Sequence, residues 1–521
     1  MNRKPIQKPA ARDGIDWSIT IFPLAAILAL SLFLIFCPDK AASGIGVLRE
    51  LLVNDLGSVY MIFGVAVVGL SLYVALSRHG ETRLGDLEKP RYSNFSWGAM
   101  IFTSTMAADI LYWALIEWAY YFNETPFAME NMTLAQKQDW SSTYPLFHWG
   151  ITPWAFYILP AAAYGYMMYV KRRPRQRMSE ACRSLLGSRV DGPLGKAIDL
   201  FAVVGLLAAT ATTFSLATPL LSGALAKVTG LTDSKGLSIG ILCCIAVVFT
   251  LAVLFGLKGI SKLANVCVTL FITLLCIFLF CGPTKYIIET GVTAIGNTFQ
   301  NFLSMSTWMD PLRLSGEGGS GFPQNWTVFY WAYWISWSVA TPFFIGKISE
   351  GRTIRQTILG AFLAGVSATF MAFIVFGNFG LHQQVTGQAD IAGMLAAGAS
   401  PSEAILTVFE ALPMTRIALL VLVLAMVCFY ASTFDALTLV IASYSLKDPK
   451  EGQEPGRKLR VFWSIVFILL PIALLFNEST LSMLQTLSIC AAFPLMIILC
   501  LIIAGFLKDL KRDRRNEELK E

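Results

Sequence analysis

Charged residues are scarce in this sequence: they form 14% of its 521 residues, whereas hydrophobic residues form 55%. Soluble globular domains carry about 25% charged residues, so this composition excludes an ordinary soluble protein. Apolar runs long enough to cross a bilayer recur along the whole chain, and no stretch has the composition of an independent soluble domain. The sequence therefore predicts a membrane protein built almost wholly of spanning segments.

Residues suited to catalysis or metal binding are equally sparse. The chain has three histidines, His79, His148 and His382, and ten cysteines that mostly lie inside apolar runs. Neither set has the spacing of a metal site or of a disulfide framework, and no nucleophile stands beside a base. We therefore predict no enzymatic activity and no cofactor, with a membrane-embedded enzyme as a remote alternative.

The apolar runs predict an all-α polytopic membrane protein with about twelve transmembrane helices. Two long connections, 283–324 and 382–414, contain apolar stretches typical of amphipathic helices on the membrane surface. The runs occupy residues 17–37, 58–77, 95–122, 146–170, 198–223, 237–256, 264–282, 325–346, 356–381, 415–446, 461–477 and 480–507.

Basic residues are distributed unevenly between the two sets of connections. If the N-terminus is cytoplasmic, the inside segments hold 32 of the 40 lysines and arginines. This bias predicts a multi-pass protein of the plasma (inner) membrane with both termini in the cytoplasm. The net charge of +6 is then a topology signal and does not indicate nucleic-acid binding. The basic run 171–177 fits a stop-transfer signal, with contact to anionic lipid as the alternative.

Aromatic residues are concentrated in the eighth run, where four of the thirteen tryptophans fall within residues 326–337. At about 100° per helical residue, an arc of roughly 140° holds Trp326, Tyr330, Trp331, Trp334 and Trp337. Tyr333 points away from that arc. Indole faces attract a quaternary ammonium group, which has no hydrogen-bond donor to offer. The pattern therefore predicts a carrier for a methylated-amine cation.

A second aromatic cluster, Trp149, Trp154 and Tyr157, opens the fourth run. These residues lie at about 0°, 140° and 80° around a helix, so they can share one face, although Pro153 can bend its entry. By itself the cluster also fits an aromatic belt at the membrane interface. In combination with the eighth run, it favours a binding site.

The third run carries acidic residues at membrane depth, where a carboxylate normally faces a partner or a polar cavity. Asp109 and Tyr112 are three residues apart and would face the same space. An ionised Asp109 about 4 Å from a bound cation would contribute on the order of 4 kcal/mol at an effective dielectric of 20, before desolvation costs. The alternative is a protonated or hydrogen-bonded structural aspartate. Glu117, two turns further on, is interpreted as structural.

The tenth run contains two adjacent hydroxyl groups, those of Ser432 and Thr433. They could supply oxygen ligands to a desolvated Na⁺, or they could donate to the carbonyl groups of their own helix. Both readings fit the composition equally well.

At these residues the chain resembles the betaine/carnitine/choline transporter family. The similarity extends over nearly the whole chain and is strongest in segments 325–334 and 346–355. Within the family, segments 117–121, 141–150 and 216–220 are similar to those of carnitine/γ-butyrobetaine exchangers.

The resemblance implies a LeuT-type fold of two inverted five-helix repeats, spans 3–7 and 8–12, usually assembled as a homotrimer. Two additional helices would precede the repeats. The implied divisions are an N-terminal segment, the first repeat, an outside connection, the second repeat and a charged cytoplasmic tail, at 1–94, 95–282, 283–324, 325–507 and 508–521.

The resemblance also implies an aromatic box around the substrate. Matched by position, the box consists of Tyr112, Trp149, Trp154, Tyr157 and Trp334. Trp337 would be a gating or transient contact, and Asp109 would select the substrate. A sodium site would involve Thr103, Met106, Ser432 and Thr433.

Three positions depart from the family pattern. Residues 106–109 replace the glycine-rich unwound stretch of sodium-coupled betaine carriers, so we expect a less complete break in the third span. The aspartate at position 109 is similar to the residue that choline carriers have there, and the substrate of those carriers has an uncompensated positive charge. Cys267 stands where the carnitine exchanger has an arginine that substitutes for sodium, while Ser432 and Thr433 match sodium-binding relatives, so both coupling modes stay open.

Together these features predict a secondary active transporter of small quaternary ammonium compounds that works by alternating access. A carnitine-like or choline-like substrate ranks first and glycine betaine next, with Na⁺ as the candidate coupling ion. The alternative is a sodium-independent carnitine/γ-butyrobetaine exchanger. A channel or receptor, the remaining class, would show no saturable counterflow.

Overall fold

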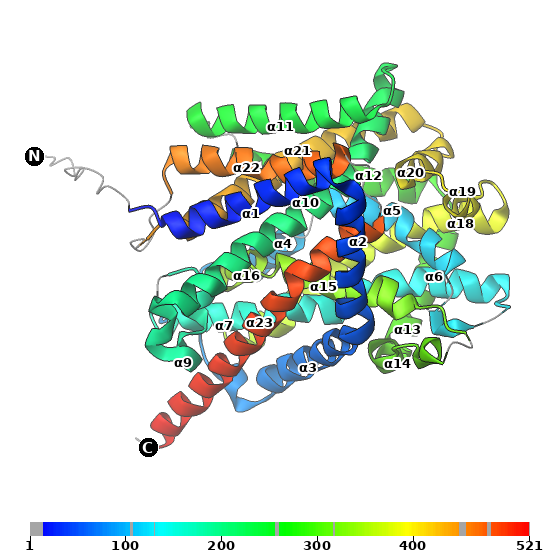
Figure 1. Cartoon of the computed structure of the whole chain (residues 1–521). Helices are drawn as coiled ribbons and strands as arrows, with labels where there is room; N and C mark the ends of the chain where they lie inside the picture. Colours follow the sequence, from blue (N-terminus) through cyan, green and yellow to red (C-terminus); the bar gives the residue numbers. More distant parts are fainter. Residues whose placement is uncertain are drawn as a thin grey trace, which may run out of the picture.

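Helices make up almost all of the chain in the computed structural model (Figure 1). The structure describes residues 14–104, 108–124, 126–129, 131–173, 175–255, 260–315, 318–447, 455–476 and 481–519. Within these residues the only β pairings are two isolated bridges, Ile15 with Leu446 and Arg83 with Thr353. The predicted all-α architecture is confirmed.

Each of the twelve predicted runs coincides with helical structure. Seven helices of the described chain are long and apolar enough to cross a membrane individually. They are α1 (Trp17–Phe36), α3 (Gly57–Leu76), α10 (Pro193–Thr229), α17 (Ile354–Ala372) with its continuation to Thr386, α21 (Thr415–Tyr444), α22 (Arg457–Phe476) and α23 (Leu481–Glu518).

Two further spans are bent pairs. Helices α4 (Asn94–Ser104) and α5 (Ala108–Asn123) meet at 67°. Residues 105–107, where we expected a less complete break, lie outside the described residues. Helices α12 (Ile260–Cys281) and α13 (Thr284–Gln300) meet at 109°, so α13 leaves the direction of the seventh span at once and enters the predicted outside connection.

The remaining three runs are shorter or interrupted. Helix α11 (Lys235–Phe255) covers the sixth run. The fourth run is divided between the end of α6 (Leu134–His148) and α7 (Ile151–Tyr169). In the eighth run, the π-helical η6 (Pro323–Thr327), α15 (Val328–Trp337) and α16 (Thr341–Ile348) follow one another.

Shorter helices fill the connections. Helix α2 (Pro38–Arg49) and the π-helical η1 (Glu50–Asp55) occupy the segment that the sequence analysis left between the first two spans. Proline at the first position and Asp39 in the first turn favour a helix start there. The other connection helices are η2 (Arg78–Glu81), η3 (Pro126–Ala128), α8 (Met178–Ala181), α9 (Arg183–Leu186), η4 (Gly187–Asp191), α14 (Phe302–Thr307), η5 (Pro311–Leu314), α19 (Ile391–Ala396) and α20 (Pro401–Glu410). The π-helical η7 (Phe373–Gly377) and α18 (Asn378–Thr386) continue the span that begins with α17.

Close packing of α7 against α16 and of α15 against α23 forms the centre of the molecule (Figure 1). Gly165 of α7 and Gly346 of α16 face each other where the first pair crosses. A Cβ atom on Gly346 would lie 2.7 Å from the carbonyl oxygen of Ala161, which is too close for any side chain. Glycine at this position therefore lets the two helix backbones touch.

Candidate functional site

Three aromatic rings from residues 149–157 converge on one residue, Trp334 of α15. The centroid of its ring lies 5.4 Å from that of Trp149, 5.8 Å from that of Trp154 and 4.9 Å from that of Tyr157. All four side chains are buried. We call Trp149, Trp154, Tyr157 and Trp334 the aromatic cage.

Trp149 reaches the cage from a break between two helices. Its backbone ends α6, and Gly150 precedes α7 with φ −100° and ψ −136°. A Cβ atom on Gly150 would lie 2.4 Å from the carbonyl oxygen of Leu146, so the break depends on this glycine. Their spacing predicted that Trp149, Trp154 and Tyr157 could share one helical face. They do not, because the break separates Trp149 from α7, although all three rings contact Trp334.

Two hydrogen bonds fix the position of Trp149. The hydroxyl of Thr369 on α17 donates to its carbonyl oxygen over 2.6 Å. Its indole N–H donates to Oε2 of Glu117 on α5 over 2.8 Å. Glu117 therefore holds a wall of the cage from outside, a role that the sequence analysis did not assign.

Trp154 is placed by a glycine behind it. A Cβ atom on Gly365 of α17 would lie 2.4 Å from two carbon atoms of the Trp154 indole. The indole therefore packs directly on the α17 backbone. Among the described residues, the buried indole N–H groups of Trp154 and Trp334 have no hydrogen-bond partner.

Tyr112, the fifth predicted box residue, and Trp337, the predicted gating contact, lie apart from these four rings. Tyr112 is buried on α5, where its ring contacts that of Trp113 with centroids 5.2 Å apart. Trp337 ends α15 and is half-buried. Within the described chain, no ring contact joins either residue to the aromatic cage.

Asp109 lies in the first turn of α5 and is buried. The hydroxyl of Tyr333 donates to its Oδ2 over 2.7 Å, and the backbone N–H of Ile110 donates to its Oδ1 over 3.0 Å. Tyr333 also pairs with the hydroxyl of Thr213 on α10. Tyr333 thus faces α5 and α10, away from the cage, as its position in the helix predicted.

The predicted cation-site residues come from two helices. Thr103 lies near the end of α4, and its hydroxyl donates to the carbonyl oxygen of Met100 over 3.1 Å. Ser432 and Thr433 are half-buried on α21. Met106 lies outside the described residues. Among the residues described, no group of three or more histidine, cysteine or acidic side chains is arranged to hold a metal ion.

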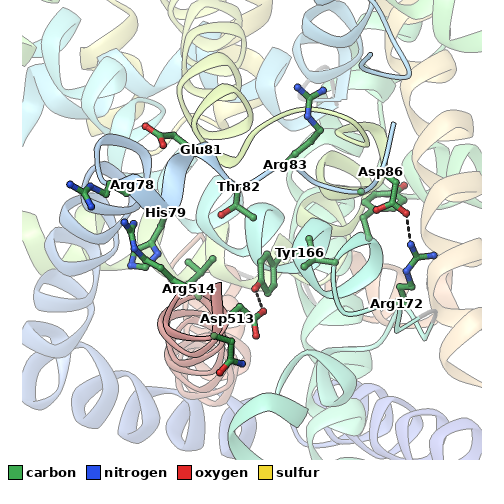
Figure 2. A pocket seen from close by; sticks show the side chains of 15 residues that line it. Arg78, His79, Glu81, Thr82, Arg83, Asp86, Tyr166, Arg172, Asp513 and Arg514 are labelled. Carbon is green, nitrogen blue, oxygen red and sulfur yellow. Dashed lines mark hydrogen bonds and ion pairs between the residues drawn. The ribbon is translucent and has the colours of Figure 1, made fainter. Parts of the chain in front are cut away.

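A cavity of about 690 Å³ lies near the C-terminal end of α23, between η2, the end of α7 and α23 itself (Figure 2). Its walls are charged: Arg172 pairs with Asp86, and Asp513 accepts hydrogen bonds from Tyr166 and Lys171. Burial, with the nearby positive charges of the α23 end, lowers the pKa of His79. None of the predicted site residues lines this cavity, so we do not assign it to the substrate.

Comparison with known proteins identifies the family. The profile of the betaine/carnitine/choline family of transporters matches residues 18–515. An uncharacterised transporter of Escherichia coli, YeaV, is 32% identical over 86% of this chain and 91% of its own length. A carnitine transporter of Acinetobacter baumannii is 28% identical over 87% and 81% of the two chains. The high-affinity choline transport protein of E. coli is 29% identical over 97% and 74%.

Among solved structures, a Na⁺-coupled sialic acid symporter aligns with 81% of this chain and 80% of its own at 12% identity, with a TM-score of 0.41. The family match is therefore the informative comparison. The chain belongs to the betaine/carnitine/choline transporter family and is a transporter rather than an enzyme, as the sequence analysis predicted.

Proposed function

We propose that this protein is a secondary active transporter that moves small quaternary ammonium compounds by alternating access. The convergence of Trp149, Trp154 and Tyr157 on Trp334 carries this proposal. Electron-rich ring faces attract a cation that cannot donate hydrogen bonds, and burial strengthens the attraction. A trimethylammonium head is the chemical group that such a cage fits best.

Substrate binding has to widen the cage. Centroid separations between 4.9 and 5.8 Å are those of rings in direct contact, and we propose that a trimethylammonium group separates them. Trp334 lies on α15, whereas Trp154 and Tyr157 lie on α7. Movement of α15 relative to α7 would open the cage, and we propose that Tyr112 and Trp337 contact the substrate in such open states.

Unpaired polar groups at the cage favour a substrate that carries an oxygen acceptor. A buried donor without a partner costs about 1–3 kcal/mol, and the indole N–H groups of Trp154 and Trp334 are in that condition among the described residues. A substrate that carries a carboxylate or hydroxyl oxygen would satisfy them. Carnitine, choline and glycine betaine all carry such an oxygen, and relatives are named as transporters of each. We propose a carnitine-like or choline-like substrate first and glycine betaine next.

Asp109 is the proposed determinant of substrate charge. Its carboxylate is buried and bonded to Tyr333 on α15, the helix that also carries Trp334. A carboxylate there would favour a cation such as choline and would repel the carboxylate of betaine or carnitine. The alternative is a structural aspartate whose role is to join α5 to α15.

The coupling ion is proposed to be Na⁺, bound near Thr103, Met106, Ser432 and Thr433. Hydroxyl oxygens are suitable ligands for this hard cation, and the half-burial of Ser432 and Thr433 on α21 is compatible with such a role. The alternative is sodium-independent exchange of carnitine for γ-butyrobetaine. Cys267, which is buried on α12, has no positive charge with which to replace sodium.

Membership of the family also supports a proposal for the wider architecture. We propose that spans 3–7 and 8–12 form two inverted repeats, at residues 95–282 and 325–507, joined by the outside connection 283–324. Segment 1–94 would add two helices and segment 508–521 a cytoplasmic tail. The protein would be a homotrimer in the plasma (inner) membrane with both termini in the cytoplasm.

Uptake by the purified protein in liposomes tests the proposal. Labelled choline, carnitine and glycine betaine are supplied separately with a sodium gradient, and counterflow is measured with unlabelled substrate inside. We expect saturable uptake and counterflow of at least one compound. Flux that does not saturate and shows no counterflow would indicate a channel, and absence of flux for all three compounds in folded protein would contradict the proposed function.

A further inference from the structure

A buried polar cluster lies directly behind the aromatic cage. It consists of Glu117 and Tyr121 on α5, His148 at the end of α6, and Thr327 at the end of η6. The exposed fractions of Glu117 and His148 are both 0%. Such deeply buried ionisable groups are costly in a membrane protein unless they are paired, and they commonly serve a function.

The cluster is connected by short hydrogen bonds. The hydroxyl oxygen of Tyr121 lies 2.7 Å from Oε1 of Glu117 and 2.7 Å from Nδ1 of His148. Nδ1 of His148 is 3.4 Å from the same carboxylate oxygen. On the other side of the ring, Nε2 lies 3.0 Å from the hydroxyl oxygen of Thr327.

The observed hydrogen bonds can all form when His148 is neutral. Tyr121 has one proton, and it donates this proton to the Glu117 carboxylate. Nδ1 of His148 then carries a hydrogen and donates to the Tyr121 oxygen. Nε2 has no hydrogen in this tautomer and accepts a hydrogen bond from the Thr327 hydroxyl. Every polar atom of the cluster is satisfied, and its net charge is −1.

The same contacts accommodate one more proton. When Nε2 of His148 is protonated, it donates to the Thr327 oxygen, and the Thr327 hydroxyl turns to donate elsewhere, as threonine in helices commonly does toward a preceding carbonyl. The other bonds stay as they were. The imidazolium ring is also stacked on Tyr330, with centroids 4.7 Å apart and planes at 19°, an arrangement that stabilises a cation.

We propose that Glu117, Tyr121 and His148 form a proton-binding site, and that protonation of His148 at Nε2 opposes substrate binding in the aromatic cage. The inference rests on the proposed function, because it requires a cationic substrate head. The connection is Trp149, whose N–H is bonded to Glu117 over 2.8 Å and whose ring contacts Trp334.

Electrostatics determines the direction of the linkage. With His148 neutral, the charge of Glu117 is uncompensated one indole ring away from the cage, and it attracts the substrate cation. Protonation reduces the net charge of the cluster to zero. Charges separated by about 10 Å at an effective dielectric of 20 change an equilibrium by on the order of tenfold. Because linkage is reciprocal, substrate binding should release a proton to the same extent.

Other titratable groups surround the cluster. The rings of Tyr144 and Tyr330 contact His148, from α6 and α15. Tyrosine titrates well above the range of histidine. One turn further along α5 and its loop, Glu124 accepts a hydrogen bond from the indole of Trp326 over 2.9 Å, and Arg49 lies near it. His148 is therefore the group in this region that carries the proposed titration.

Calorimetry on the purified full-length protein tests the proposal. Choline, carnitine and glycine betaine are each titrated into the protein between about pH 5.5 and 8.5, where histidine titrates. Buffers with different ionisation enthalpies report the number of protons released on binding. We expect affinity for a ligand that binds to rise on the order of tenfold with pH, with proton release over the part of the range in which His148 titrates.

His148→Gln is the test variant and His382→Gln the matched control, because His382 on α18 contacts Tyr286 rather than the cage. We expect the first variant to lose both pH dependence and proton release, and the second to retain them. Binding without proton release in the wild type, a result that needs no variant, would overturn the proposal. So would unchanged proton release in His148→Gln. Binding of none of the three compounds at any pH would instead contradict the proposed function.

Discussion

The hydroxyl of Tyr333 donates a hydrogen bond to Oδ2 of Asp109 over 2.7 Å, so the buried carboxylate is tied to the helix that carries Trp334. This hydrogen bond therefore weakens the attraction that the Asp109 carboxylate can exert on a substrate cation. The arrangement also means that changes at Asp109 can act on the substrate or on the joint between α5 and α15, and the two effects have to be separated by choice of ligand.

Asp109→Gly should weaken choline binding far more than betaine binding. The substitution removes a negative charge that favours a cation and repels the carboxylate of betaine. We expect choline affinity to fall by on the order of tenfold. This loss is smaller than removal of a free carboxylate would cause, because one oxygen of Asp109 already accepts a hydrogen bond from Tyr333. Competition binding with both ligands measures the difference. Asp109→Asn, which keeps an acceptor for Tyr333, is the control, and equal losses for both ligands would make Asp109 structural.

Trp334→Leu should weaken every quaternary ammonium ligand. Trp334 contacts all three other cage rings, and loss of a desolvated cation–π partner costs at least about 1–2 kcal/mol. Ligand affinity measured by calorimetry should therefore fall roughly fivefold or more. Trp17→Leu serves as the control because Trp17 is 62% exposed on α1. Retention of full affinity in Trp334→Leu would mean that the cage is not the substrate site.

Gly365→Ala should narrow the cage without changing any residue that lines it. The new methyl group would meet the Trp154 indole at 2.4 Å, so the indole has to move toward Trp334. We expect triethylcholine to lose more affinity than choline, because the larger head has less room. Gly69→Ala on α3 is the control, since no atom lies within 4 Å of a Cβ there. Equal losses for both ligands would indicate a general packing defect.

Sodium should increase uptake if Ser432 and Thr433 contribute to a cation site. Thr433→Ala is then expected to abolish sodium stimulation while preserving the fold. Ser443→Ala is the control on the same helix, because the Ser443 hydroxyl is bonded to the Leu439 carbonyl. The measurement is uptake of labelled carnitine into liposomes with and without Na⁺. Robust exchange in sodium-free liposomes preloaded with carnitine would contradict sodium coupling and favour the exchanger.

Span positions could be predicted from the sequence because hydrophobic length is a local property. The interruptions could not. The break between α6 and α7 falls inside one continuous apolar run, and it is stabilised by the contacts of Gly150 and by the distant Thr369. The helix α2 after the first span was also missed, because its short polar sequence has no apolar periodicity to mark it.

The cage was predicted more completely than its supports. Indoles at helical spacing identify an aromatic surface, so Trp154, Tyr157 and Trp334 could be selected from the pattern and the family resemblance. Glu117 was interpreted as structural because its partner, Trp149, is 32 residues away on another segment. The only local signal was the spacing of Glu117 and Tyr121, one helical turn apart, which predicts their mutual hydrogen bond.

Helix α23 is 38 residues long, which at 1.5 Å per residue gives a rod of roughly 57 Å. Near its start the Ser488 carbonyl accepts a hydrogen bond from Ser336 of the cage-bearing α15, and near its end Asp513 holds Lys171, just beyond α7. The helix thus links α15, which carries Trp334, to the charged segment that follows α7. A fluorescent or spin label on the exposed Arg515 position would report opening of the cage without touching it.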